Sequence, residues 1–376
     1  MKRLLAGILL TMSFAAVTLA AEVQHWSEKT ANDWYTMQPW LVGSNYILAD
    51  AINQLEMWQA DSFDPQRIDL ELGWAQGLGM NTMRVFLHDL LWQQDSAGFQ
   101  KRIETFLSIA AKHKIRPLFV LFDSCWDPSP KLGKQRDPRP GVHNSGWVQS
   151  PGAAALRDAT QYPRLEAYVK GLVGAFAHDP RVLGWDVWNE PGNRNDSSYG
   201  RLEPPNKADL VLKLFPAVFA WARAAGPDQP LTSGLWEGRD WSLPDKLSPI
   251  EKVQLEMSDV ISFHSYEVRE MFEKRVKSLE PYHRPVLCTE YMARGNGSTF
   301  QGTLPIAKKY KVAAINWGFV AGKTQTYFPW DSWAHPYTDR HPSIWFHDIF
   351  RKDGTPYRLE EVKFIRKMTG SPAGGG

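Results

Sequence analysis

Two glutamates each come directly after a short apolar run that has the composition of a buried strand. Glu190 follows the run Leu183–Asn189 and precedes Pro191, which stops a strand because proline has no amide proton for the sheet ladder. Glu290 follows Pro285–Thr289 in the same way. Taken singly, either glutamate is as well explained as a solvated residue at a strand end. As a pair across a cleft, however, two carboxylates are the apparatus of glycoside hydrolysis: one protonates the leaving oxygen and the other attacks the anomeric carbon.

These glutamates need a scaffold that brings both strand ends to one opening. The chain contains eight short apolar segments of strand character, separated by segments with helical spacing. The expected strands are residues 40–46, 82–87, 116–122, 183–189, 231–235, 260–264, 285–289 and 312–317. The expected helices are residues 65–78, 99–114, 162–178, 207–225, 249–257, 268–279, 304–310 and 359–368. Such alternation predicts a parallel sheet covered by helices, and eight repeats favour closure into a single (β/α)8 TIM barrel.

In a barrel of this kind, catalytic residues lie at the carboxyl ends of the strands. Glu190 and Glu290, after the fourth and seventh strands, would therefore face the same opening. An open, doubly wound sheet is the structural alternative. It usually carries a glycine-rich phosphate loop after its first strand, and Gly43–Tyr46 does not have that pattern.

Two connections at the same end of the predicted barrel are long. Residues 125–151, after the third strand, are rich in Pro, Gly and Asp and carry Trp126 and Trp147, so we interpret them as a loop of the site. Residues 322–333, after the eighth strand, form a polar and aromatic loop. This second loop either walls one end of the cleft, which would restrict the protein to chain ends, or is only a stable cap.

The ordered set of residues at the strand ends resembles the retaining glycoside hydrolases on (β/α)8 barrels, and most of all glycoside hydrolase family 5, the cellulase and mannanase family. The resemblance spans nearly the whole chain after its amino-terminal segment. It rests on Arg84 after the second strand, Asn189-Glu190-Pro191 after the fourth, His264 and Tyr266 around the sixth, Glu290 after the seventh, and Trp317 after the eighth.

The resemblance implies a role for each carboxylate and its neighbours. Glu190 would be the general acid and then the general base, with a pKa raised by the second carboxylate and by partial desolvation. Glu290 would be the ionised nucleophile. Arg84 would hold Glu290 through charge-assisted hydrogen bonds and the Tyr266 hydroxyl would orient it. A purely structural ion pair is the alternative for Arg84.

The remaining implied roles concern the sugar. Asn189 would bond its 2-hydroxyl, a contact that strengthens in the transition state. His264 would lie beside the acid, and Trp317 would be the stacking floor; a packing histidine and a core tryptophan are their alternatives. Asp123 and Trp126 are expected to line the cleft, as are His88 and Trp236-Glu237. Family members often carry a histidine after the third strand, where this chain reads Asp123-Ser124-Cys125-Trp126, so the family's substrate contacts are not carried over there.

Composition narrows the class of protein. The 376 residues are 43% hydrophobic with a formal net charge of +2, which supplies a large core but not the basic surface of a nucleic-acid binder. The 17 tryptophans suit the apolar faces of sugar rings, although tryptophan also fills cores.

There is no His-x-His, HExxH or Gly-x-Ser-x-Gly pattern, so we expect no metal, no cofactor and no serine-hydrolase chemistry. The two cysteines, Cys125 and Cys288, either pair or are buried free thiols.

The chain is expected to have three parts. Residues 1–21 have the basic, apolar and small-residue regions of a signal peptide, so we expect export, periplasmic or secreted, and no membrane association after cleavage. An uncleaved anchor is the alternative. Residues 22–370 would be one catalytic domain and residues 371–376 a disordered tail. The protein would be a monomer.

These observations together predict a retaining β-glycoside hydrolase acting on a β-linked glycan such as β-glucan, mannan or xylan. An exo-acting β-glycosidase on short oligosaccharides is one alternative. A carbohydrate-binding barrel that has lost catalysis is another, and it would be expected to lack one of Glu190, Glu290 or Arg84, all of which are present.

Overall fold

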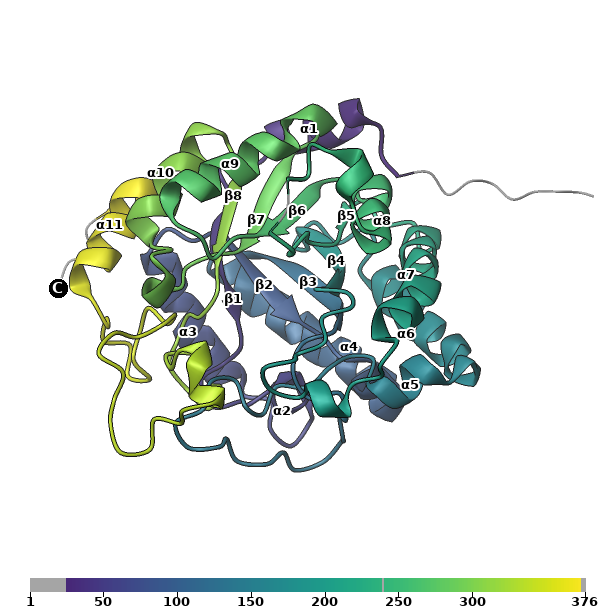
Figure 1. Ribbon diagram of the computed structural model, residues 1–376, viewed down its shortest axis with the longest axis horizontal. Coiled ribbons are helices and arrows are strands. Elements are labelled where there is room, and N and C mark those ends of the chain that lie inside the picture. The colour runs from purple at the N-terminus through teal and green to yellow at the C-terminus, as the bar shows by residue number, and fades with distance from the viewer. Residues whose placement is uncertain (1–24, 239, 373–376) are drawn as a thin grey trace, which may run out of the picture.

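Eight parallel strands form the centre of the molecule. The computed structural model describes residues 25–238 and 240–372; the predicted signal peptide lies outside them. The strands are β1 (Val42–Tyr46), β2 (Thr82–Phe86), β3 (Arg116–Asp123), β4 (Gly184–Asn189), β5 (Leu231–Thr232), β6 (Ile261–His264), β7 (Val286–Glu290) and β8 (Ala313–Asn316). Their order in the sheet is β5-β4-β3-β2-β1-β8-β7-β6 (Figure 1). Each expected strand is present, although β5 is shorter than residues 231–235.

The ends of this sheet meet just after β5. Leu235 N donates to Ser262 O at 2.9 Å, and His264 N donates to Leu235 O at 2.8 Å, which bridges the chain beyond β5 to β6. The eight-stranded sheet is thereby closed into a barrel. The predicted (β/α)8 architecture is confirmed.

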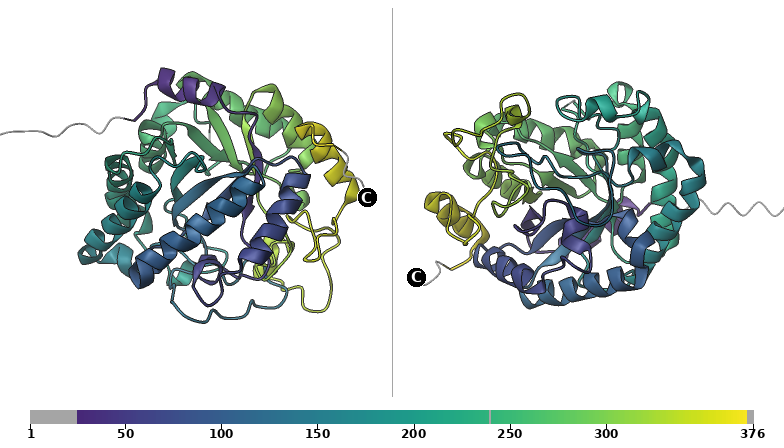
Figure 2. Two further views of the ribbon diagram at one scale, coloured as in Figure 1. Left: turned by 180° about the vertical axis from the view of Figure 1, so that it is seen from behind. Right: turned by 90° about the horizontal axis from the view of Figure 1, so that it is seen from below.

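Helices surround the barrel as an outer ring (Figure 2). They are α1 (Glu28–Thr36), α2 (Gln54–Trp58), α3 (Pro65–Gly77), α4 (Asp89–Lys112), α5 (Ala153–Arg157), α6 (Tyr162–Ala175), α7 (Lys207–Ala224), α8 (Pro249–Met257), α9 (Arg269–Leu279), α10 (Phe300–Lys309) and α11 (Leu359–Thr369). The eight expected helices are among them. Local chemistry explains several of their starts: Ser248 and Glu251 form a capping box at α8, and the Thr299 side chain caps α10.

Three short helices were not expected from the sequence. The first, α1, lies in the polar segment before β1. Its sequence is polar, and its aromatic side chains pack against residues that are distant in the chain. Trp34 and Tyr35 pack against a cluster at the amino ends of the strands that includes Leu41, Leu118 and Leu183. This helix therefore covers the end of the barrel opposite the predicted site. The others, α2 and α5, lie within connections at the carboxyl ends of the strands.

Both long loops are present at the carboxyl ends of β3 and β8. Residues 124–152 run from β3 to α5, and residues 317–358 run from β8 to α11 with one short 3-10 turn at Trp330–Trp333. Cys125 and Cys288 are separate, buried free thiols. Of the expected tail, Ser371 donates its backbone N–H to Arg366 O at 3.0 Å; residues 373–376 lie outside the described part. Within the described ranges no helix is long and apolar enough to cross a bilayer.

One close approach in the barrel wall gives a test of its packing. A Cβ added at Gly43 in β1 would lie 2.0 Å from the Thr82 carbonyl oxygen of β2, whereas one at Gly174 in α6 meets its nearest neighbour at 3.9 Å. We expect Gly43→Ala to lower the free energy of unfolding by about 1–3 kcal/mol or more. Gly174→Ala is the matched control, and urea unfolding should show it unchanged or slightly stabilised. Equal effects of the two changes would contradict the register of β1 and β2.

Candidate active site

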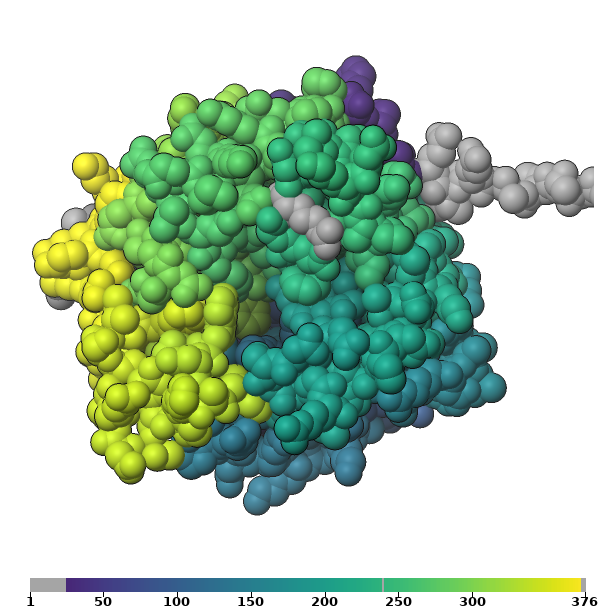
Figure 3. Space-filling model, in the orientation of Figure 1, coloured from purple at the N-terminus to yellow at the C-terminus, as the bar shows by residue number. Residues whose placement is uncertain are grey.

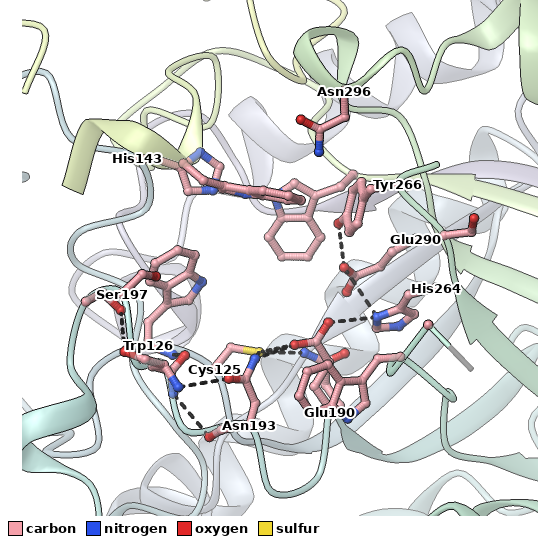
Figure 4. A pocket seen from close by; sticks show the side chains of 18 of the residues that line it. Cys125, Trp126, His143, Glu190, Asn193, Ser197, His264, Tyr266, Glu290 and Asn296 are labelled. Carbon is pink, nitrogen blue, oxygen red and sulfur yellow. Dashed lines mark hydrogen bonds and ion pairs between the residues drawn. The ribbon is translucent and has the colours of Figure 1, made fainter. Parts of the chain in front are cut away.

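The two glutamates lie at the same opening of the barrel. Glu290 is the last residue of β7, and Glu190 comes directly after β4 with a φ of 42°. A positive φ is uncommon for a residue with a Cβ and here turns the chain at the point where Pro191 follows. One carboxylate oxygen of Glu190, one of Glu290 and a ring nitrogen of His264 all lie within 4.8 Å of one another (Figure 4). One oxygen of each carboxylate is thus within 4.8 Å of the other, which is compatible with the separation of about 5–5.5 Å between the carboxyl groups of retaining glycosidases.

Glu290 is held by the two residues that the resemblance indicated. Arg84 Nη1 donates to Glu290 Oε1 at 2.8 Å, and the Tyr266 hydroxyl donates to Glu290 Oε2 at 2.6 Å. Arg84 is fully buried and also bonds Asp186 Oδ2 through Nε at 3.0 Å and Nη2 at 2.8 Å. Arg84 therefore makes both of the contacts that were considered for it: it holds Glu290 and it forms a buried ion pair with Asp186.

Glu190 accepts hydrogen bonds from three side chains. His264 Nδ1 lies 2.9 Å from Glu190 Oε1, while Asn193 Nδ2 and Cys125 Sγ donate to Oε2 at 2.6 and 3.2 Å. The same His264 nitrogen is 3.6 Å from Glu290 Oε2. The ring of His264 therefore lies between the two carboxylates.

These contacts give Glu190 a pKa direction opposite to the expected one. Burial raises the pKa of Glu190, but hydrogen bonds from His264, Cys125 and Asn193, together with the charge of His264, lower it to a net value below the usual one. At Glu290 burial prevails with help from the Glu190 charge, so its pKa is raised despite His264, Arg84 and Tyr266. The sequence-based expectation of a raised pKa at Glu190 did not include these donors. Because the carboxyls interact, their protons are lost as those of a coupled pair.

Asn189 and Asp123 form a chain of hydrogen bonds behind the glutamates. Asn189 Oδ1 accepts from Arg84 Nη2 at 2.6 Å, and Asn189 Nδ2 donates to Asp123 Oδ1 at 2.9 Å. Asp123 also accepts from the indole of Trp147 at 2.6 Å, and burial raises its pKa to about 6. The Asp123 carboxylate is thus directed at Asn189 and Trp147. The structure places it as a support of Asn189 and not, as predicted, on the cleft wall.

A cavity of about 650 Å³ opens above the carboxylates. The surface is hollowed between the yellow-green loop after β8 and the teal segments after β4 and β5 (Figure 3). The residues that line the cavity share polar or aromatic side chains and include Trp126, His143, Asn189, Glu190, Asn193, Trp236, His264, Tyr266, Glu290, Asn296, Trp317 and Trp330. Trp317 and Trp126 are therefore in contact with the cavity, as expected. His88 is instead buried at the start of α4, where its ring accepts from Leu90 N.

Several members of the site were missed in the sequence. Asp186 had a usable signal, because it is a charged residue inside the apolar run of β4. Cys125, Asn193 and His143 had none, since each lies in a loop whose path depends on the whole fold. Asn45 of β1 was also missed; its side-chain oxygen accepts from Arg84 at 2.9 Å.

Within the described ranges, Glu190, His264 and Glu290 are the one group of three side chains that could hold a metal ion. The Arg84 guanidinium, 2.8 Å from Glu290, opposes a second cation at that carboxylate. The hydrogen-bond donors around Glu190 and Glu290 suit one carboxylate that transfers a proton and one that acts as a nucleophile.

Known structures share this fold. The exo-β-1,4-mannosidase Op5Man5 from Opitutaceae bacterium strain TAV5 superposes with a TM-score of 0.57 at 18% identity, covering 88% of this chain and 60% of that one. A GH5_18 protein from Streptomyces cattleya, in complex with Manβ1-4GlcNAc, gives 0.55 at 13% identity, covering 88% and 80%. The β-mannanase of the blue mussel Mytilus edulis gives 0.53 at 16% identity, covering 78% and 89%.

At these identities the similarity establishes the fold that this chain shares with glycoside hydrolases of that type. The chain spans 60% of the length of the Opitutaceae protein. Neither the protein-family models nor the curated protein sequences gave a match.

The position of His264 can be tested through the pKa of Glu190. In His264→Phe we expect this pKa to rise by about one unit or more, because a hydrogen bond to a charged group contributes about 1.5–3 kcal/mol and one pKa unit is about 1.4 kcal/mol. Cys125→Ala removes a weaker donor and should give a smaller rise in the same direction. Titration of ¹³C-labelled glutamate carboxyls by NMR, with Glu190→Gln for assignment, measures both. An unchanged pKa in His264→Phe would contradict the role assigned to the ring.

The buried charges around Arg84 make a second prediction. Arg84→Met should lower the free energy of unfolding by about 3–5 kcal/mol at neutral pH, because it leaves Asp186 and Glu290 buried without their counter-charge. The double variant Arg84→Met/Asp186→Asn should recover part of the loss. Urea unfolding measures the difference, and no recovery in the double variant would argue against a shared ion-pair network.

Proposed function

We propose that this protein is a retaining β-glycoside hydrolase in which Glu190 is the acid/base and Glu290 the nucleophile. The observation that carries the proposal is the carboxylate pair within 4.8 Å at the carboxyl end of the barrel, with Arg84 and Tyr266 on one member and His264 on the other. A barrel that only binds carbohydrate would not need this set of donors on both carboxylates.

In the first step, Glu290 attacks the anomeric carbon as the bond to the leaving oxygen breaks, and Glu190 gives its proton to that oxygen. In the second, Glu190 takes a proton from water, the water oxygen bonds to the anomeric carbon, and the bond to Glu290 breaks. Arg84 and Tyr266 hold the Glu290 oxygens in place and stabilise the charge that returns when Glu290 leaves.

The charge of Glu290 adjusts Glu190 between the steps. The first step needs the proton on Glu190 and an ionised Glu290, the reverse of the order of pKa values that the surrounding donors set in this structure. Once Glu290 is ionised, its charge favours a proton on Glu190. Esterification of Glu290 removes that charge, so the pKa of Glu190 falls and the residue is suited to act as a base. The ionised carboxylate of Glu190 is then stabilised by its hydrogen bonds with His264, Asn193 and Cys125.

The Asn189 side chain is oriented to donate a hydrogen bond to the sugar. Its side-chain oxygen is occupied by Arg84, so its amide faces the site as a donor. One amide hydrogen is directed to Asp123, while the other partner of the nitrogen is the Cys125 sulfur at 3.4 Å, a weak acceptor. A sugar 2-hydroxyl would replace this sulfur contact with a stronger bond.

For the substrate we propose β-mannosides. The support comes from solved structures that share the fold. They are a β-1,4-mannosidase, a GH5_18 protein in complex with Manβ1-4GlcNAc, and a β-mannanase. The cavity offers Trp126, Trp317 and Trp330 as faces for sugar rings.

Replacing each carboxylate separates their roles. Glu290→Ala should lose turnover of every glycoside, whereas Glu190→Ala should lose about 10²–10⁴-fold in kcat/KM on substrates with a poor leaving group and far less in kcat/KM on a dinitrophenyl glycoside, whose departure needs no acid. Steady-state kinetics on β-mannosides with the two leaving groups give the comparison. Near-UV circular dichroism controls for folding, and wild-type rates in either variant would contradict the mechanism.

An external nucleophile distinguishes the carboxylates further. With azide, Glu290→Ala should give a glycosyl azide of inverted configuration, because azide attacks from the face that Glu290 occupied. Glu190→Ala should give one of retained configuration, because azide then attacks the covalent intermediate. NMR of the products reads the configuration, and the opposite pattern would exchange the two roles.

A further inference from the structure

The two long loops at the top of the barrel are joined into one structure. His143 N donates to Ser332 Oγ at 2.9 Å, and the Trp333 indole donates to His143 O at 2.9 Å. Asn144 N donates to Thr324 O at 2.8 Å. These bonds connect residues 124–152 with residues 317–358, which leave the barrel from different strands. We call the joined segments, residues 141–147 and 324–333, the loop wall.

The loop wall is extended by aromatic contacts to the segment after β4. The Trp126 and Trp333 rings are stacked with centroids 5.6 Å apart and planes at 14°. Tyr199, from the segment after β4, lies edge-on to Trp333 at 5.0 Å, and its hydroxyl donates to Ser145 O at 2.6 Å. Three connections from β3, β4 and β8 therefore meet at Trp333.

The loop wall stands beside the floor expected under the reacting sugar. Trp317 contacts Trp147 of the wall, with ring centroids 5.8 Å apart, and Phe86 at 5.9 Å. His143 and Trp126 lie across the cavity from Glu290 and Tyr266 (Figure 4). In the proposed function the anomeric carbon of the sugar over Trp317 meets Glu290, so the opposite, non-reducing end of that sugar would point to the wall. The other part of the cavity lining, towards which a leaving group can extend, includes Trp236, Ser265 and Glu267 after β5 and β6.

His143 offers the wall a means of recognising a chain end. It lines the cavity beside Trp126 (Figure 4), and its Nδ1 donates to Phe328 O at 2.8 Å. Burial lowers the pKa of His143 to about 4, so the ring is neutral near pH 7 and its Nε2 is an acceptor. A free hydroxyl of a terminal sugar can donate to this nitrogen, whereas an oxygen that carries a further sugar cannot.

We propose that the loop wall ends the cleft on the glycone side, so that the protein cleaves only from the non-reducing ends of β-linked chains and releases a product of one fixed length. This inference rests on the proposed function. It assigns Trp126, His143 and Trp333 to the limit of the cleft and makes chain ends and short oligosaccharides the substrates, in place of the interior of a polysaccharide.

The wild-type protein provides the first test. It would be given β-1,4-linked manno-, gluco- and xylo-oligosaccharides of graded length, labelled at the reducing end, and a soluble linear mannan, with mass spectrometry and viscosity as readouts. We expect labelled chains to shorten in equal steps from the unlabelled end while viscosity falls slowly. Early internal fragments with a rapid fall in viscosity, or release of the labelled unit first from long chains, would overturn the inference and leave the proposed function standing. No hydrolysis of any oligosaccharide or aryl glycoside would overturn both.

A matched pair of variants tests the wall itself. Trp333→Ala removes the stack on Trp126 and the bond to His143. Trp345→Ala removes a ring of the same loop that stacks on Tyr357 at 4.5 Å and contacts the wall at Tyr327, 5.1 Å away, on the loop's own segment. Relative to aryl-glycoside turnover, which controls for folding of the centre, Trp333→Ala should raise internal cleavage of linear mannan at least several-fold. Trp345→Ala should keep the stepwise pattern. A stepwise pattern in Trp333→Ala with aryl-glycoside turnover retained would overturn the role of the wall.

Discussion

The Arg84 guanidinium is the charge around which the barrel opening is organised. It leaves β2 inside the barrel and bonds Asn45 of β1, Asp186 and Asn189 of β4, and Glu290 of β7. A fully buried cation is costly without counter-charges, and only a closed barrel brings two carboxylates from different strands to it. The same contacts that stabilise Arg84 hold Glu290, the proposed nucleophile, and the Asn189 amide that is proposed to bind the sugar. The hydrogen bonds that stabilise the buried Arg84 charge are therefore the same ones that position the side chains of the candidate active site.

The two carboxylates have different neighbours although they occupy equivalent places in the fold. Glu290 is bonded by a permanent cation and by a phenol. Glu190 is bonded by His264 at the end of β6 and by Cys125 and Asn193 from the connections after β3 and β4, and the His264 ring also lies near Glu290. Two of the three donors on Glu190 thus come from loops, whereas Glu290 is held by one barrel residue, Arg84, and by Tyr266 from the segment after β6. In the proposed mechanism, this arrangement would allow the proton on Glu190 to change through the reaction cycle while Glu290 stays in one position.

The loops after β3 and β8 form one side of the opening above this centre. A (β/α)8 barrel supports many chemistries because its carboxyl-end loops vary independently of the strands. In this chain the connections after β3 and β8 bond to each other, and the Trp126, Trp333 and Tyr199 rings close the space between them. Their contacts link residues up to 190 positions apart. The wall is a property of the assembled molecule, because its bonds join two loops that leave the barrel from different strands.

Sequence by itself was enough to predict the eight strands, the closed barrel and the place of Glu190 and Glu290 at one opening. Those features follow from local apolar runs, from Pro191 and from the topology of parallel strands, which bring all carboxyl ends to one face. The tertiary structure decided which donors surround each carboxylate, that Asp123 supports Asn189 instead of lining the cleft, and that two loops join. Cys125 and Glu190 are 65 residues apart, and His143 and Ser332 are 189 apart. No local pattern encodes such distances, because they depend on the packing of every strand and loop between them.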